Sequence, residues 1–177
     1  MQDATHTGSA SAARAPARHA SMIEDGLLAG IIGAAVVAVW FLVLDFSRGR
    51  PFFTPSLLGS VLLLSENVEE VTSVNVVMVF AYTGVHGILF LIAGAVLSWM
   101  FHQLERNPQL GLVLLLLFAL FEAVLFGLEV TVVPNLMGAL GAFAVAFANL
   151  LSAGAMFWFL LRRHPETMAR LREAWNE

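Results

Sequence analysis

The sequence predicts an all-α, polytopic membrane protein: a bundle of four transmembrane helices with a short interfacial helix between the first two. Two observations predict this class. Of the 177 residues, 59% are hydrophobic and only 12% are charged, whereas about a quarter are charged in ordinary soluble domains. The apolar residues also gather into runs that match the roughly 20 helical residues needed to cross a bilayer. We expect spans at about 23–46, 75–101, 110–133 and 136–161.

The chain starts with a polar segment that leads into the first span. Residues 1–22 are rich in alanine, serine, threonine and arginine and show no apolar periodicity, which is typical of a disordered tail. The first span carries small residues at four-residue steps, Gly26, Gly30 and Ala34, which would let another helix approach closely. Helical periodicity extends this face to Asp45. We expect Asp45 either at the mouth of the bundle or at its rim in contact with water.

The loop between the first two spans has internal order. Arg48 and Arg50 leave the membrane, and Thr54-Pro55 matches an N-cap followed by proline at the first helical position. The apolar run that follows is too short to cross a bilayer. A helix over about 55–64 is therefore expected to lie at the membrane interface.

The second and third spans carry the ionisable residues that interrupt the apolar runs. At 1.5 Å per residue, His86 and Glu122 each lie roughly 15–17 Å from the outer boundary, near the bilayer midplane. The short connection between the two spans favours antiparallel neighbours, so we expect His86 and Glu122 to form a hydrogen-bonded pair. Near the outer edge we expect a second cluster, formed by Asp45, Arg48, Arg50 and Glu129.

The fourth span has a small face, and the chain ends in a polar tail over 165–177. The residues of this face would allow close helix packing and include one amide: Gly138, Ala142, Ala146 and Asn149. An even number of spans puts both termini on one side of the membrane. That side, together with the second loop, carries seven of the nine basic residues, so the positive-inside rule places both termini in the cytoplasm.

Three roles are open for the expected inner pair of His86 and Glu122. The two groups can satisfy one another and set the helix register. They can serve a small transporter or proton-coupled carrier, with a buried glutamate and a histidine relay. They can also belong to a haem- or quinone-binding redox subunit, with His86 as one haem ligand and a second ligand from another copy of the chain. No cofactor or metal is expected from one chain, because no Glu-x-x-His spacing and no cysteine occur.

The remaining patterns favour a protein without catalytic activity. No Ser-His-Asp set, His-Glu-x-x-His motif or phosphate-binding glycine loop can be assembled. The net charge of −4 is small and dispersed, which argues against a nucleic-acid partner. We therefore expect an accessory or structural subunit that contacts the lipid bilayer and packs with itself or with other membrane-protein subunits.

Four motifs together resemble a known group of proteins. They are AVVAVWFLVLD in the first span, GRPFFTPSLLG in the loop, Tyr-x-x-x-His-Gly at Tyr82 to Gly87, and Phe121-Glu122. The pattern covers about Gly26 to Pro165 and is similar to a group of small, uncharacterised four-span bacterial membrane proteins. The resemblance implies a four-helix protein of the bacterial inner (cytoplasmic) membrane and implies no activity.

Overall fold

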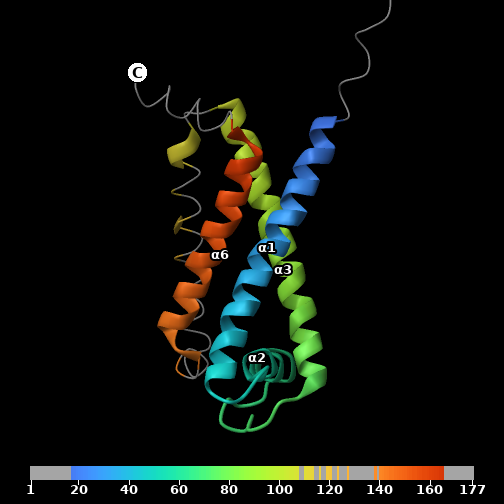
Figure 1. The fold of residues 1–177 in the computed structure, drawn as a ribbon, viewed down its shortest axis with the longest axis vertical. Helices are drawn as coiled ribbons and strands as arrows, with labels where there is room; N and C mark the ends of the chain where they lie inside the picture. The colour runs from blue at the N-terminus through green and yellow to red at the C-terminus, as the bar shows by residue number, and fades with distance from the viewer. Residues whose placement is uncertain are drawn as a thin grey trace, which may run out of the picture.

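The computed structural model describes residues 17–107, 110–113, 116, 119–120, 123, 127, 138 and 140–165. Within these residues the chain is helical and contains no strand. The complete helices are α1 (Ala17–Ser47), α2 (Phe53–Leu64), α3 (Val76–Arg106) and α6 (Ala142–Arg163). The three long helices run along the long axis of the molecule, and α2 lies across their lower end (Figure 1). The all-α prediction is confirmed for the described part of the chain.

Three of these helices are long and apolar enough to cross a membrane: Met22–Ser47 within α1, then α3 and α6. Many of their large apolar side chains point outward, and exposing this much apolar surface to water would be unfavourable in free energy. Phe80, Ile88 and Ile92 on α3 are each more than half exposed, as are Phe143 and Leu150 on α6. At about 25 cal/mol per Å² of apolar surface, such a surface is stable only against lipid or another protein. The chain is thus a helical membrane protein.

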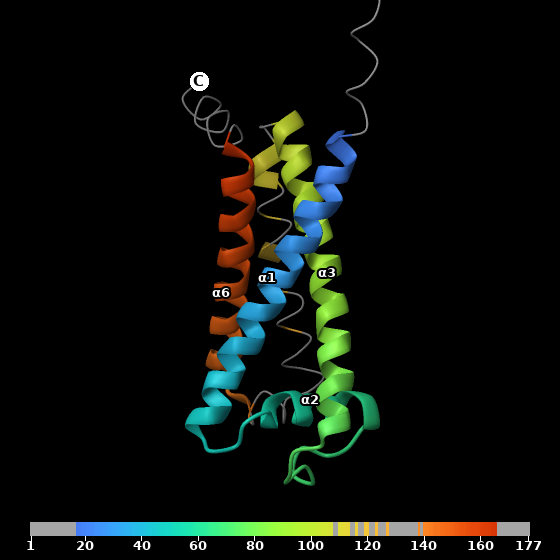
Figure 2. The ribbon, with the colours of Figure 1, turned by 45° about the vertical axis from the view of Figure 1, so that its right-hand side comes forward.

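The third expected span, 110–133, lies largely outside the described residues, so a four-span bundle is not among the observed features. Those of its residues that are described from Gly111 onward are helical. Hydrogen bonds join the ends of the described long helices. The Ser98 hydroxyl of α3 donates to the Met22 carbonyl, and the Trp40 indole of α1 donates to the Ala144 carbonyl. Helix α3 therefore ends beside the start of α1, and α6 starts beside the end of α1 (Figure 2).

Two helix starts differ from the expected boundaries. Helix α1 begins at Ala17, inside the segment 1–22 that we expected to be a disordered tail. Helix α6 begins at Ala142, whereas the span was expected from residue 136. Gly141 before it has a φ of 85°, a left-handed conformation that interrupts a right-handed helix and that only glycine adopts without strain.

Helix α2 agrees closely with the expected interfacial helix, but its N-terminus is built differently. The helix begins at Phe53, and the residue before it, Phe52, has a left-handed backbone (φ 64°) and makes no side-chain cap. The prediction that Thr54 is the N-cap is therefore wrong, because Thr54 already lies inside the first turn. Its amide is bonded instead by the carboxylate of Asp45, from the end of α1.

Glycines bring α1 and α3 into backbone contact. A Cβ atom at Gly26 would lie 2.8 Å from the Cα of Ala95, and one at Gly30 would lie 2.8 Å from the Cα of Leu91. Gly94 faces them from α3, and a Cβ there would collide with the backbone of Gly30. The two helices can cross at this distance only because all three positions lack a side chain.

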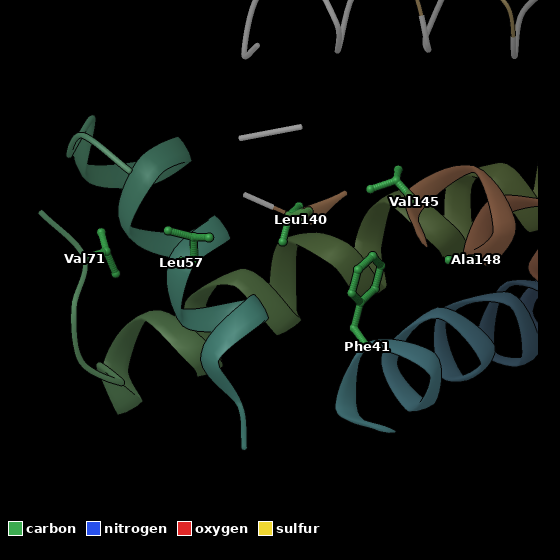
Figure 3. Close-up of a cluster of buried hydrophobic side chains, with 6 residues drawn as sticks. All are labelled: Phe41, Leu57, Val71, Leu140, Val145 and Ala148. Carbon is green, nitrogen blue, oxygen red and sulfur yellow. The ribbon is translucent and has the colours of Figure 1, made fainter. Parts of the chain in front are cut away.

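Buried side chains form two clusters, one at each end of the bundle. At the α2 end, α1 contributes Phe41, α2 contributes Leu57 and α6 contributes Val145, with Val71, Leu140 and Ala148 completing the set (Figure 3). At the opposite end the cluster consists of Ala29, Phe101, Met156 and Leu160. Helix α1 thus packs on α6 in both clusters, and α3 joins it in the second cluster through Phe101.

Candidate functional site

The buried face of α1 carries an aspartate at each of its ends. Asp25 and Asp45 are 2% and 1% exposed. Twenty residues of helix separate them, which corresponds to a rise of about 30 Å, the thickness of the hydrocarbon core of a bilayer. Each carboxylate therefore lies near one membrane boundary, where a buried charge requires close polar partners. These two positions are here named the Asp25 site and the Asp45 site.

The Asp25 site joins the start of α1 to the end of α6. The Arg163 guanidinium contacts Asp25 Oδ1 through Nε at 2.8 Å and through Nη2 at 2.7 Å. The other carboxylate oxygen, Oδ2, lies 3.1 Å from His164 Nε2. Both oxygens of Asp25 are thus engaged by cationic or potentially cationic groups. Glu24 stands 3.7 Å from Arg163 in exposed surroundings, so it adds little to the site.

His164 extends the site to α3. Its Nδ1 atom lies 2.7 Å from Glu105 Oε1, while its Nε2 atom faces Asp25. Carboxylates only accept hydrogen bonds, so both contacts are hydrogen bonds at once when both ring nitrogens carry a proton. His102 packs edge-on against the same ring with centroids 6.2 Å apart, and its buried Nδ1 has no hydrogen-bond partner in the described part of the structure. One imidazole therefore links the ends of α1, α3 and α6.

The Asp45 site is made from neutral donors close by in the sequence. Asp45 Oδ2 accepts from the backbone amide of Thr54 at 2.7 Å, and Oδ1 accepts from the Thr54 hydroxyl at 2.7 Å. The carboxylate thereby satisfies a free amide in the first turn of α2, and its charge faces the positive end of that helix dipole. This pairing turns the chain sharply after α1 and holds α2 across the end of the bundle.

Helix α2 also contacts the start of α3, through a hydrogen bond from Asn75 to Ser56 and through close packing of Gly59 on Met78. The Asn75 amide donates to the hydroxyl of Ser56 at 2.8 Å, and the Asn75 side chain caps α3 by accepting from Val77 and Met78. Gly59 lies so close to Met78 that a Cβ there would collide with the α3 backbone. Helix α2 is consequently a fixed part of the bundle.

The expected outer cluster of Asp45 with Arg48 and Arg50 is not formed. Asp45 faces inward to Thr54, and no ion pair joins it to either arginine among the described contacts. The Arg50 guanidinium lies instead 4.0 Å above the ring of Phe53, and Arg48 is exposed. A nearby amide and hydroxyl bond the carboxylate in fixed geometry, whereas flexible arginine side chains remain hydrated. Glu129 lies outside the described residues.

His86 lies on the face of α3 that meets α1. Its Nε2 donates to the backbone carbonyl of Ala34 at 3.3 Å, and its ring packs between Tyr82 and Phe90, with centroids 5.8 and 4.7 Å away. The expected partner, Glu122, lies outside the described residues. The pairing of His86 with Glu122 therefore stays a prediction, as do the carrier and redox roles that depend on it.

The expected packing residues of α1 lie in its contact with α3, whereas the expected packing face of α6 is largely exposed. Gly26 and Gly30 lie in the crossing with α3, and Ala34 supplies the carbonyl that His86 contacts. On α6 the buried positions are Val145, Ala148, Ser152, Met156 and Leu160. The expected face is offset from them, with Ala142 and Ala146 exposed and Asn149 partly buried. That face is thus not the one through which α6 packs on α1.

The sequence interpretation missed the Asp25 site. A signal was present: an acidic pair, Glu24-Asp25, opens the first span, and Arg162-Arg163-His164 closes the last one. In a chain with both ends on the same side of the membrane, these segments lie at the same depth. Nothing in the sequence shows that α1 and α6 are neighbours, which is the information needed to pair them.

Together these contacts describe a helical membrane protein in which a buried aspartate near each end of α1 bonds that helix to its neighbours. No group of histidine and carboxylate side chains suited to hold a metal ion occurs among the residues that the structure describes. Comparison with protein families, with characterised proteins and with solved structures finds no match for this chain.

Proposed function

We propose that this protein is a non-catalytic accessory or structural subunit that packs in the membrane with itself or with a larger complex. One observation carries the proposal: α6 keeps a small-residue face outside its own core. Ala142 and Ala146 are exposed, and a Cβ at Gly138 would meet no described atom within 4 Å. This small face of α6 (Ala142, Ala146), which Gly138 precedes in the chain, consists of small residues like the α1–α3 crossing but has no helix against it in the described structure.

The physical reason is the way helices associate in lipid. Lipid removes the hydrophobic drive, so helices join where small residues let their backbones approach. Gly26, Gly30 and Gly94 serve that purpose inside the molecule. A second small face on the outside suits contact with a helix of another chain.

The polar sites support a structural role over a chemical one. Asp25 and Asp45 are each bonded by groups of the chain itself, and Ser152 and Ser98 donate to backbone carbonyls of α1. Buried polar groups satisfied in this way set the register and neighbours of helices. The hydrogen bonds and ion pairs described for these four side chains all join groups of the chain itself.

The proposal includes the placement of the protein in the membrane. We propose that the chain crosses the bacterial inner membrane four times, with one crossing over about 110–133, and that both termini lie in the cytoplasm. The distribution of basic residues supports this orientation. Arg106, Arg162 and Arg163 end helices on the side of the termini, whereas Arg48 and Arg50 occupy the opposite side.

Cysteine cross-linking tests the small face directly, since the chain contains no cysteine. Ala146→Cys places one thiol on the face, and Leu151→Cys places one about 140° around α6, at another exposed position. Oxidation in native membranes should give a disulfide-linked species or a larger adduct for Ala146→Cys alone. A native mass of the tagged wild-type chain should match that species. Equal cross-linking of both variants, or a lone chain in both measurements, would overturn the proposal.

A further inference from the structure

A hollow of about 410 Å³ opens between α2 and the segment that leads from α2 to α3. This volume is within the range of sites that bind small molecules. The floor is apolar: Leu57 and Val71 line it and belong to the buried cluster at this end of the bundle (Figure 3). The rim is polar and includes Arg50, Glu69 and Thr72.

The rim presents two opposite charges that do not neutralise each other. Arg50 and Glu69 form no ion pair within the described structure, although both line the hollow. The Arg50 guanidinium lies on the Phe53 ring, 4.0 Å from its centroid, and this contact holds the cation at the wall of the hollow. A molecule that carries an anion and a cation a few bonds apart would satisfy both groups.

The level of the hollow in the membrane indicates what that molecule is. Asp45 marks the boundary of the hydrocarbon core on this side, and Arg50 follows it by five residues in the connecting turn. Helix α2 exposes Leu62, Leu63 and Leu64 at its C-terminal end, which is typical of a helix lying in the interface. The hollow is therefore level with the phospholipid headgroups, and its apolar floor is continuous in depth with their acyl chains.

We propose that this hollow binds the phosphoethanolamine headgroup of a phospholipid in the leaflet on the α2 side. Arg50 receives the phosphate, with the Thr72 hydroxyl as a second donor, and Glu69 receives the primary ammonium. A guanidinium and a carboxylate match these groups through charge-assisted hydrogen bonds. A choline headgroup carries a quaternary ammonium without N–H donors, so it cannot make the bond to Glu69.

Native mass spectrometry of the full chain in detergent tests this inference. The probes are short-chain phosphatidylethanolamine, phosphatidylcholine and phosphatidylglycerol with identical acyl chains, together with free phosphoethanolamine. Phosphatidylethanolamine should bind with a Kd lower than that of phosphatidylcholine by roughly fivefold, the upper range for an exposed ion pair. Free phosphoethanolamine should bind more weakly than the lipid, because it lacks the chains. Equal binding of the two zwitterionic lipids, or equal binding of the free headgroup and the lipid, would overturn the proposal.

Charge-removing variants separate the two halves of the site. Arg50→Gln should weaken phosphatidylethanolamine and phosphatidylglycerol alike, by roughly fivefold. Glu69→Gln should weaken phosphatidylethanolamine by a similar factor and leave phosphatidylglycerol no weaker. The matched controls are Arg48→Gln and Glu70→Gln, which remove neighbouring charges that do not line this hollow. A control that weakens binding as much as its partner variant would show general surface electrostatics in place of a site.

Discussion

Each end of α1 carries a buried aspartate, and the two carboxylates are bonded by different kinds of partner. Asp25 and Asp45 are both almost fully buried, one near each end of the apolar part of α1. Asp25 is held by Arg163 and His164, which lie some 138 residues further along the chain. Asp45 is held by the amide and hydroxyl of Thr54, nine residues away. The first aspartate joins helices that are distant in sequence, and the second shapes a local turn.

The difference shows how a buried carboxylate can serve two purposes in one membrane protein. A charge pair across helices determines which helices are neighbours, since an unpaired charge at that depth is costly. A carboxylate at a helix N-terminus determines where the next helix starts and in which direction it runs. We therefore expect the Asp25 site to control tertiary stability and the Asp45 site to control the placement of α2.

The largest expected effect is at the Asp25 site. Asp25→Ala leaves Arg163 and His164 without their buried partner and should lower the free energy of unfolding by about 3 kcal/mol, at the lower limit for breaking a buried pair because Arg163 remains partly hydrated. Unfolding in detergent, followed by circular dichroism, measures this. Glu24→Ala is the matched control and should change stability by less than about 0.5 kcal/mol. Similar losses for the two variants would show that Asp25 is not a specific partner.

A smaller effect is expected at the Asp45 site. Asp45→Ala should cost about 2 kcal/mol, the upper range for loss of a helix-capping side chain, because the Thr54 hydroxyl also loses its acceptor. The change should appear as faster proteolysis or hydrogen exchange in α2 and should leave α1 and α6 protected. Asp45→Asn keeps one acceptor and should recover part of the loss. Uniform loss of protection throughout the bundle would contradict the local role of Asp45.

The smallest effect is expected at His164. His164→Phe keeps the ring against Phe101 and removes both carboxylate contacts, so we expect a loss of about 1 kcal/mol. A double-mutant cycle with Glu105→Gln isolates the contribution of the α3 contact. The two changes should be non-additive. Strict additivity would show that the Nδ1 contact with Glu105 contributes no stability of its own.

Part of the fold and of its sites could be predicted because the relevant signals are local. Hydropathy and length predict the long apolar helices, and a short apolar run predicts α2 within two residues of its observed start. The small residues Gly26 and Gly30 lie at a helix crossing of the kind such spacing favours. The N-terminus of α2 was predicted wrongly because threonine is a residue type that often caps helices. In the structure the Asp45 carboxylate, from the end of α1, accepts the hydrogen bond of the Thr54 amide instead.

The sequence by itself determined that this chain is an all-helical membrane protein. Its residues are 59% hydrophobic and form long apolar runs, so a soluble fold would lack the polar surface that it needs. Only the tertiary structure decided which polar groups meet. Asp25 could pair with Arg163 and His164 only after α1 and α6 became neighbours, and Asp45 turned to Thr54 because the turn at Gly49 brought α2 back across the bundle. The tertiary structure also decided that α6 packs through Val145 and Met156 and leaves Ala142 and Ala146 outside. The physical reason is the same in each case: helical periodicity defines faces, and packing over long sequence distances chooses among them.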